Sequence, residues 1–341
     1  MYYSKYFEGI KKETIKNVNV IVGEEIYLID KFIGQIKEHY IMPDFEDFNY
    51  NFLDGKQIKG AEMIAIAETL PFMADKKVVV VEDFLAMSSK GGEAEDLDEL
   101  KKYMESANPS TILIFSFKEL SLDKRKKVTK EILKKADLIE FPKLKEDDLR
   151  KWISKKINQY NKKILDKDIA YMVENLGYQE RNSEKTLYDI ENELIKVVGF
   201  VEDSPYITEA DLRATLPRNL QNNIFELIDF ISQGKKLQAM KLLDDMLLNN
   251  EPEQLILFML IKHYRQAIYV KHLSEKGYGQ MDIADKLGIN KFVVSKLLQQ
   301  SKKESVKYYQ SVYRKAYSMD KKIKMGEMDS RIGIEVLIST L

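Results

Sequence analysis

Strand-like and helix-like hydrophobic patterns alternate along the first 141 residues of the chain. Short, continuous apolar runs predict buried strands, and these runs occupy residues 18–23, 48–52, 78–81, 111–117 and 138–141. Apolar residues at helical spacing predict helices between them, at residues 26–40, 58–69, 97–106 and 125–135. This alternation is typical of a parallel sheet with helices on both faces.

The pattern after Pro142 is helical throughout. Helical periodicity predicts helices at residues 146–160, 168–175 and 187–198, and another that begins near residue 207. Further long helical segments start at Ile224, Lys236, Pro252 and Ser305. With a boundary near Pro217, we expect three domains: an α/β domain at residues 1–142, a small helical domain at 143–216 and a last helical domain at 217–341.

A large apolar cluster stands immediately before the valine run at residues 78–81. Leu70, Phe72 and Met73 surround Pro71, which stops the preceding helix. One interpretation is a rigid apolar docking peptide, with Lys76 and Lys77 as charges at its rim. The other is a helix end that tucks its apolar side chains into its own domain, because exposed apolar clusters are uncommon on monomers.

Composition narrows the classes of function. The chain has 341 residues, no cysteine and three histidines, which are scattered. Disulfides and thiolate metal sites are therefore excluded, and we expect no metal site. No apolar run approaches the length of a membrane span, so we expect no membrane partner. The net charge is −1, but the segment from Lys286 to Lys324 contains 11 basic side chains and only two acidic ones. This segment is either a weak nucleic-acid footprint or a solvated helix face.

Gly23 lies between a predicted strand and a predicted helix, where a phosphate-binding P-loop would begin. A P-loop needs a second glycine five positions later, then a lysine and a Ser or Thr. The chain has Leu28, Ile29 and Asp30 there. Without the lysine, and with an acid that repels phosphate, the sequence predicts a degenerate and inactive P-loop.

Glu82 and Asp83 follow the valine run, as acids follow a Walker B strand that holds Mg²⁺. The usual order is Asp and then Glu. Without a P-loop lysine, we favour the simpler interpretation, in which the two acids cap the end of a strand.

Several segments together resemble the bacterial DNA polymerase III delta subunit, the clamp-loader component that opens the sliding clamp. The resemblance is carried by residues 67–73 with 76–81, by 188–196, and by 222–229, 234–239 and 320–326. It covers nearly the full chain, although residues 178–185 look longer and more charged than the family pattern, which leaves the role of that loop open.

The resemblance implies a fold and a function. The fold would be an AAA+-like α/β domain that has lost ATP chemistry, a helical lid domain and a helical collar. Leu70, Phe72 and Met73 would bind the sliding clamp (beta). The partners would be delta-prime, the gamma/tau subunits and primer-template DNA, in the cytoplasm. The chain would have no intrinsic ATPase and no cofactor, and would belong to a DNA-directed DNA polymerase holoenzyme.

Two other classes of function stay open at this point. Residues 283–297 have helix-turn-helix spacing, with Ala284, Gly288 at the turn, Ile289, Val294 and Leu297. This pattern would suit a DNA-binding regulator, although two helices packed around a glycine turn give the same spacing. The second of these classes is an active P-loop ATPase, which measurable ATP turnover would favour.

Overall fold

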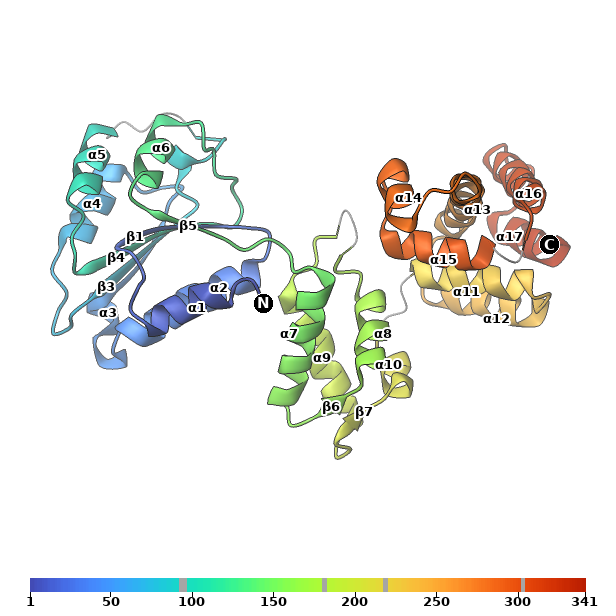
Figure 1. Ribbon diagram of the computed structural model, residues 1–341, viewed down its shortest axis with the longest axis horizontal. Helices are drawn as coiled ribbons and strands as arrows, with labels where there is room; N and C mark the ends of the chain where they lie inside the picture. The colour runs from blue at the N-terminus through green and yellow to red at the C-terminus, as the bar shows by residue number, and fades with distance from the viewer. Residues whose placement is uncertain (92–96, 180–182, 217–219, 302–303) are drawn as a thin grey trace. The chain divides into compact units, whose positions relative to one another are not determined.

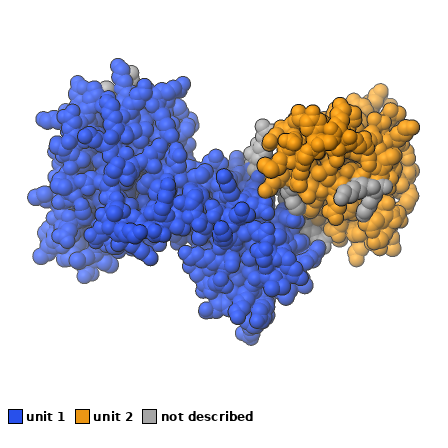
Figure 2. Space-filling model, viewed as in Figure 1, with its two compact units in different colours: residues 1–215 blue, residues 216–341 orange. Residues whose placement is uncertain are grey.

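The computed structural model describes residues 1–91, 97–179, 183–216, 220–301 and 304–341 (Figure 1). The chain divides into two compact units, residues 1–215 and residues 216–341 (Figure 2). Pro217, the predicted boundary residue, lies outside the described residues. The further division of the first unit at residue 142 stays a prediction.

A five-stranded parallel sheet forms the centre of the first unit, in the order β2-β3-β4-β1-β5. The strands are β1 (Val18–Val22), β2 (Tyr50–Asp54), β3 (Lys77–Glu82), β4 (Thr111–Phe117) and β5 (Asp137–Glu140). All seven residues of β4 are buried, as are Val78–Val81. Continuous apolar runs suit such strands because helices cover both faces of a parallel sheet.

Helices cover the two faces of this sheet (Figure 1). On one side lie α1 (Ser4–Lys11) and α2 (Ile26–Tyr40), and on the other lie α4 (Gly60–Glu68), α5 (Leu97–Glu105) and α6 (Lys127–Leu133). Short 3-10 turns occupy Pro43–Phe45 and Leu85–Met87. The predicted parallel sheet with helices on both faces is confirmed.

The strand predicted at residues 48–52 is wrong in its first half. Residues Glu46–Asn49 form a short helix, α3, and the strand begins at Tyr50. Pro43 and the acids that follow it favour a helical start, since proline and negative charge suit the first turn. Phe48 therefore belongs to a helix and not to the sheet.

The rest of the first unit is mainly helical. Its helices are α7 (Glu146–Gln159), α8 (Asp166–Leu176), α9 (Leu187–Val201) and α10 (Glu209–Thr215). The prediction of a wholly helical region is wrong at one place, because β6 (Lys163–Ile164) and β7 (Tyr206–Ile207) pair in parallel. These two-residue strands are too short to give a period in the sequence.

The secondary structure of the second unit, in the residues that the structure describes, consists of helices around one long central helix. The helices are α11 (Leu220–Ser232), α12 (Lys236–Leu248), α13 (Glu253–Glu275), α14 (Gln280–Leu287), α15 (Lys291–Ser301), α16 (Val306–Lys324) and α17 (Ser330–Thr340). The buried face of α13 includes Leu260, Tyr264 and Ala267, which join the core that the other helices share. In the described part of the chain, no helix combines the length and apolarity needed to cross a membrane.

Candidate functional site

The predicted docking residues lie together on a surface loop between α4 and β3. The exposed fractions are 80% for Leu70, 48% for Phe72 and 72% for Met73. Helix α4 ends at Glu68, three residues before Pro71, which agrees with the restriction that proline places on the preceding backbone. These side chains are therefore not a tucked-in helix end, and we call residues 70–73 the docking element.

Helix α3 holds this element from the side. The buried Asn49 donates from Nδ2 to the Phe72 carbonyl at 2.9 Å, and its Oδ1 accepts from the Phe72 N–H at 2.7 Å. The Phe72 ring lies 4.9 Å from the Phe48 ring and 5.9 Å from the Phe45 ring. An exposed aromatic side chain is thus attached to a fixed piece of backbone.

Lys77 does not lie at the rim of the element, as the sequence suggested. It is buried at the first position of β3, where its ammonium group donates to the Ile66 carbonyl at 3.0 Å and to the Thr69 hydroxyl. Burial lowers the pKa of its ammonium group. Lys77 therefore satisfies the end of α4, while Lys76 donates to the Pro109 carbonyl at 2.6 Å.

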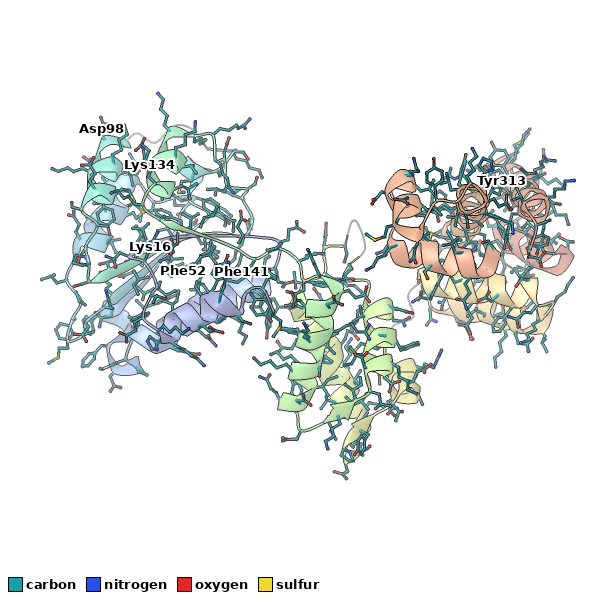
Figure 3. The ribbon with its side chains drawn as sticks, viewed as in Figure 1. Lys16, Phe52, Asp98, Lys134, Phe141 and Tyr313 are labelled. Atoms are coloured by element: carbon teal, nitrogen blue, oxygen red, sulfur yellow. The ribbon has the colours of Figure 1, made fainter. Side chains whose placement is uncertain are left out.

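The connection from β1 to α2, at the predicted P-loop position, contains only Gly23, Glu24 and Glu25. A Cβ added to Gly23, whose φ is +149°, would lie 2.1 Å from the Phe141 carbonyl oxygen (Phe141 is labelled in Figure 3). Glu25 N also donates to that carbonyl at 3.0 Å. Gly23 therefore serves the close approach of two backbone segments, whereas a P-loop wraps several glycine-rich residues around a phosphate.

The other three degenerate P-loop residues are used inside the protein. Leu28 and Ile29 are buried on the inner face of α2. Asp30 pairs with the Lys118 ammonium at 2.7 Å and accepts from the Tyr188 hydroxyl at 2.8 Å. The carboxylate that would repel phosphate is therefore neutralised by the chain itself.

The two acids at the end of β3 are also engaged. Glu82 pairs with Lys118 at 2.5 Å, so one ammonium group bridges Glu82 and Asp30. The buried Asp83 accepts from the backbone N–H groups of Lys118, Glu119 and Leu120 at 3.0 to 3.2 Å. These contacts agree with the strand-capping interpretation.

A buried hydrogen-bond cluster, which the sequence did not reveal, occupies the same region. Glu25 accepts from the Tyr178 hydroxyl at 2.5 Å and from Leu187 N at 3.0 Å, and Leu144 N donates to the Tyr178 oxygen at 3.0 Å. Burial raises the pKa of the Glu25 carboxyl, and the two donated bonds partly offset this rise. Tyr178 thus gives one structural role to the segment 178–185, of which residues 180–182 lie outside the described residues.

Comparison with known proteins accounts for most of the chain. Residues 20–142 match the family model of the DNA polymerase III delta subunit, and residues 221–341 match that of its C-terminal domain. The DNA polymerase III subunit delta of Bacillus subtilis is 27% identical over 338 residues, covering 98% of this chain and 95% of that protein. The chain belongs to the DNA polymerase III delta subunit family.

Further relatives agree with this membership. The probable delta subunit of Aquifex aeolicus is 23% identical over 302 residues, covering 86% of this chain and 82% of that one. The solved Bacillus subtilis DNA clamp loader delta protein has a TM-score of 0.57 at 25% identity, covering 98% of both chains. The sheet domain is therefore AAA+-like, and it is followed by helical domains, as predicted.

The helix-turn-helix pattern lies within the part of the delta family that the C-terminal model covers. Gly288 is left-handed between α14 and α15, with φ of +61°. Ile283, Val294 and Leu297 are in the core of the second unit. Helix α15 also meets α11, because Gln300 donates to Asp229 Oδ1 at 2.9 Å. The spacing thus reflects packing of the two helices.

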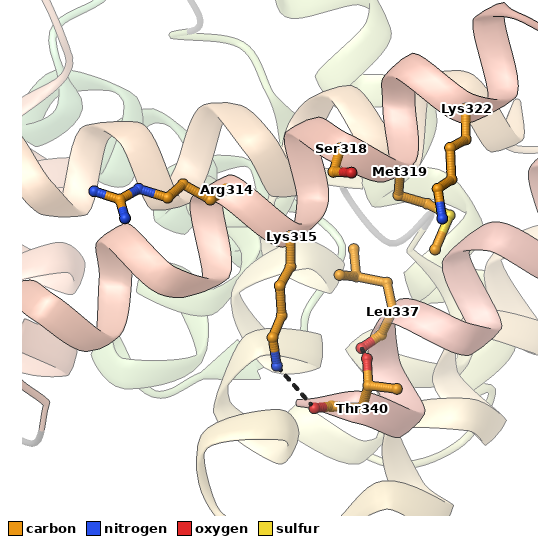
Figure 4. Close-up of a pocket in the computed structure, with 7 residues that line it drawn as sticks. All are labelled: Arg314, Lys315, Ser318, Met319, Lys322, Leu337 and Thr340. Carbon is orange, nitrogen blue, oxygen red and sulfur yellow. Dashed lines mark hydrogen bonds between the residues drawn. The ribbon is translucent and has the colours of Figure 1, made fainter.

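Three basic side chains of α16 line a hollow on the second unit. Figure 4 shows this hollow of about 350 Å³ between α16 and α17, lined by Arg314, Lys315, Ser318, Met319, Lys322, Leu337 and Thr340. Lys315 donates to the Thr340 carbonyl at 3.3 Å. The lining of the hollow combines these basic side chains with the apolar Met319 and Leu337.

A metal site is not found elsewhere in the described residues either. Across all the residues that the structure describes, no group of three His, Asp or Glu side chains is placed to hold a metal ion.

Proposed function

We propose that the chain is a clamp-loader subunit that binds the ring-shaped sliding clamp (beta) and opens it for loading onto primed DNA. The observation that carries this proposal is the exposure of Leu70, Phe72 and Met73 on a loop whose backbone is fixed by Asn49. Membership of the delta family supports it. The apolar side chains insert into an apolar pocket of the clamp, which stabilises the open ring if contacts to that state are stronger.

A fluorescent donor and acceptor placed across the clamp's ring interface test the opening step. We expect the wild-type chain to increase their separation without nucleotide. The double variant Phe72→Ala, Met73→Ala should leave the ring closed. A matched control is Leu165→Ala, Phe200→Ala, because these side chains are exposed to similar extents, 60% and 55%, on other elements. Opening by the docking variant, at wild-type concentration, would mean that the element lies elsewhere.

We also propose that the chain has no ATPase activity of its own. The three-residue loop at Gly23 supports this proposal. So do the contacts of the two acids, because Glu25 accepts a hydrogen bond from Tyr178 and Asp30 pairs with Lys118. Calorimetry with Mg-ATP should give no binding heat at micromolar concentrations. Micromolar affinity or steady turnover would favour an active ATPase instead.

The remaining partners follow from the same proposal. The helical region 217–341 acts as a collar that holds the chain in a loader with delta-prime and the gamma/tau subunits, and primer-template DNA is bound within that complex. The chain would act in the cytoplasm. Removing residues 217–341 should abolish assembly but leave clamp binding intact, as judged by gel filtration with the partner subunits. Normal assembly of the truncated chain would remove the collar assignment.

A further inference from the structure

The hydrogen bonds described for the Asn49 side chain go to Phe72 alone. The Asn49 side chain is fully buried, and both of its polar atoms bind the backbone of that single residue. A buried amide is costly unless both of its hydrogen-bonding atoms are paired. An apolar residue would be easier to bury at this position. The amide therefore fixes the N–H and the carbonyl of Phe72 together, and so fixes the direction of its side chain.

The backbone after Phe72 also departs from an ordinary loop. Met73 has φ of +49°, in the left-handed region that non-glycine residues rarely adopt. Such a residue persists only where its surroundings hold it. The Asn49 contact lies immediately before this position, and the Met73 side chain is 72% exposed. The loop is thus held in a conformation that displays two large apolar side chains in succession.

Phe48 extends the same surface. It is 59% exposed, and its ring lies 4.9 Å from the Phe72 ring. A pocket that receives Phe72 would meet Phe48 as well, because the two rings are in contact. Exposed, contiguous aromatic side chains mark interaction surfaces on soluble proteins.

We propose that α3 is the second half of the clamp-binding surface. Phe48 contacts the sliding clamp beside Phe72, and Asn49 is a positioning residue that acts through Phe72. The occupant is the apolar clamp pocket, by continuity with the docking element, so this inference rests on the proposed function. A backbone fixed before binding lowers the ordering cost that association would otherwise carry.

Dissociation constants of the full chain with the sliding clamp of the same organism test the positioning role. Asn49→Ala should weaken binding about tenfold, because Phe72 then has to be ordered on binding. Asn19→Ala is the matched control, since Asn19 is also fully buried in the sheet domain and donates to a backbone carbonyl, at 2.7 Å from Lys16 O. The control should stay within about twofold. Wild-type affinity of a folded Asn49→Ala chain would overturn the proposal.

A double-mutant cycle separates positioning from a general loss of structure. In a Phe72→Ala background, Asn49→Ala should cost less than about twofold, because the ring that it positions is gone. An equal loss in both backgrounds would overturn the positioning role. If Asn49→Ala does not fold, Asn49→Leu takes its place, because it keeps a similar side-chain volume without a charge and removes both hydrogen bonds to Phe72. Wild-type affinity of Asn49→Leu would then count against the proposal.

Phe48→Ala tests the contact role, with Phe200→Ala as the control of similar exposure. We expect a loss of about fivefold or more for Phe48→Ala and none for Phe200→Ala. No loss for Phe48→Ala would overturn the contact role. The Phe72→Ala variant distinguishes the failure of the docking element from the failure of the role of α3. If Phe72→Ala binds the clamp normally, the assignment of the docking element is wrong. If Phe72→Ala loses affinity while Asn49→Ala and Phe48→Ala do not, only the role of α3 is wrong.

Discussion

The docking element and the predicted P-loop position expose their side chains to opposite extents. At the docking element, Leu70 and Met73 are apolar and largely exposed. At the predicted P-loop position and the neighbouring end of β3, Glu25 and Asp83 are acidic and buried. Each arrangement opposes the usual distribution of residue types. Each is also held by specific hydrogen bonds from elsewhere in the first unit.

The difference shows which parts of the surface are left for a partner. Apolar side chains that stay in water are available for binding, whereas acids that are fully paired with the chain itself are not. Glu25 at the predicted P-loop position is thus part of a hydrogen-bonded joint inside the first unit.

Replacing Glu25 should destabilise the first unit strongly. Glu25→Ala leaves the Tyr178 hydroxyl and Leu187 N without their acceptor, and we expect a loss of about 3 kcal/mol in the free energy of unfolding. Chemical denaturation measures the loss, and the exposed neighbour Glu24→Ala is the control. The folded Glu25→Ala chain should bind the clamp normally. A stable variant would show that the hydrogen bonds of Glu25 contribute little to stability.

Burial of a titratable group can be checked independently in the second unit. His263 is buried in α13, and burial lowers its pKa from 6.5 to about 3. Between these values the unfolded chain binds a proton that the folded chain does not, so stability falls as the pH falls below 6.5. At pH 5 the loss should be about 2 kcal/mol.

Denaturation curves at pH 7 and pH 5 measure this loss. His263→Gln should remove it, whereas His272→Gln, which changes an exposed histidine, should not. An unchanged pH dependence in His263→Gln would contradict the assignment to this side chain.

Replacing Met73 with glycine should stabilise the chain and weaken clamp binding. Met73→Gly relieves the left-handed backbone, so the free energy of unfolding should rise by about 1 kcal/mol. The same change removes an exposed apolar side chain, and clamp affinity should fall about tenfold. Met73→Ala is the control: it should lose affinity without gaining stability. If Met73→Gly is no more stable than wild type, the loop is not strained.

The strands were predictable because their residues carry the signal locally. The run Val78–Val81 is buried and β-branched, and four of the five buried positions of β3 follow from it. The exposure of the docking residues was one of two interpretations that the sequence left open, and the family resemblance, not Pro71 alone, favoured it. The position of α3 was not predictable, because Phe48 and the aromatic residues that follow it form a pattern typical of a strand.

The contacts that hold the site were not predictable, because they join distant parts of the chain. Asn49 binds a residue 23 positions away, and Glu25 binds Tyr178 153 positions away. Lys77 looks like a surface charge in the sequence, yet its long stem is buried and its ammonium group reaches the end of α4. One-dimensional patterns record which residue is polar, but not which partner satisfies it.

Titration calorimetry of the isolated chain with the sliding clamp, without nucleotide, is the most direct test of the docking element. Phe72 and Met73 together could bury on the order of 200 Å² of apolar surface, which corresponds to about 5 kcal/mol before entropic costs. The account predicts binding without ATP, unchanged by added Mg-ATP. It also predicts a loss of about two orders of magnitude or more in the folded Phe72→Ala, Met73→Ala variant. Wild-type affinity of that variant, or binding that requires ATP, would contradict the account.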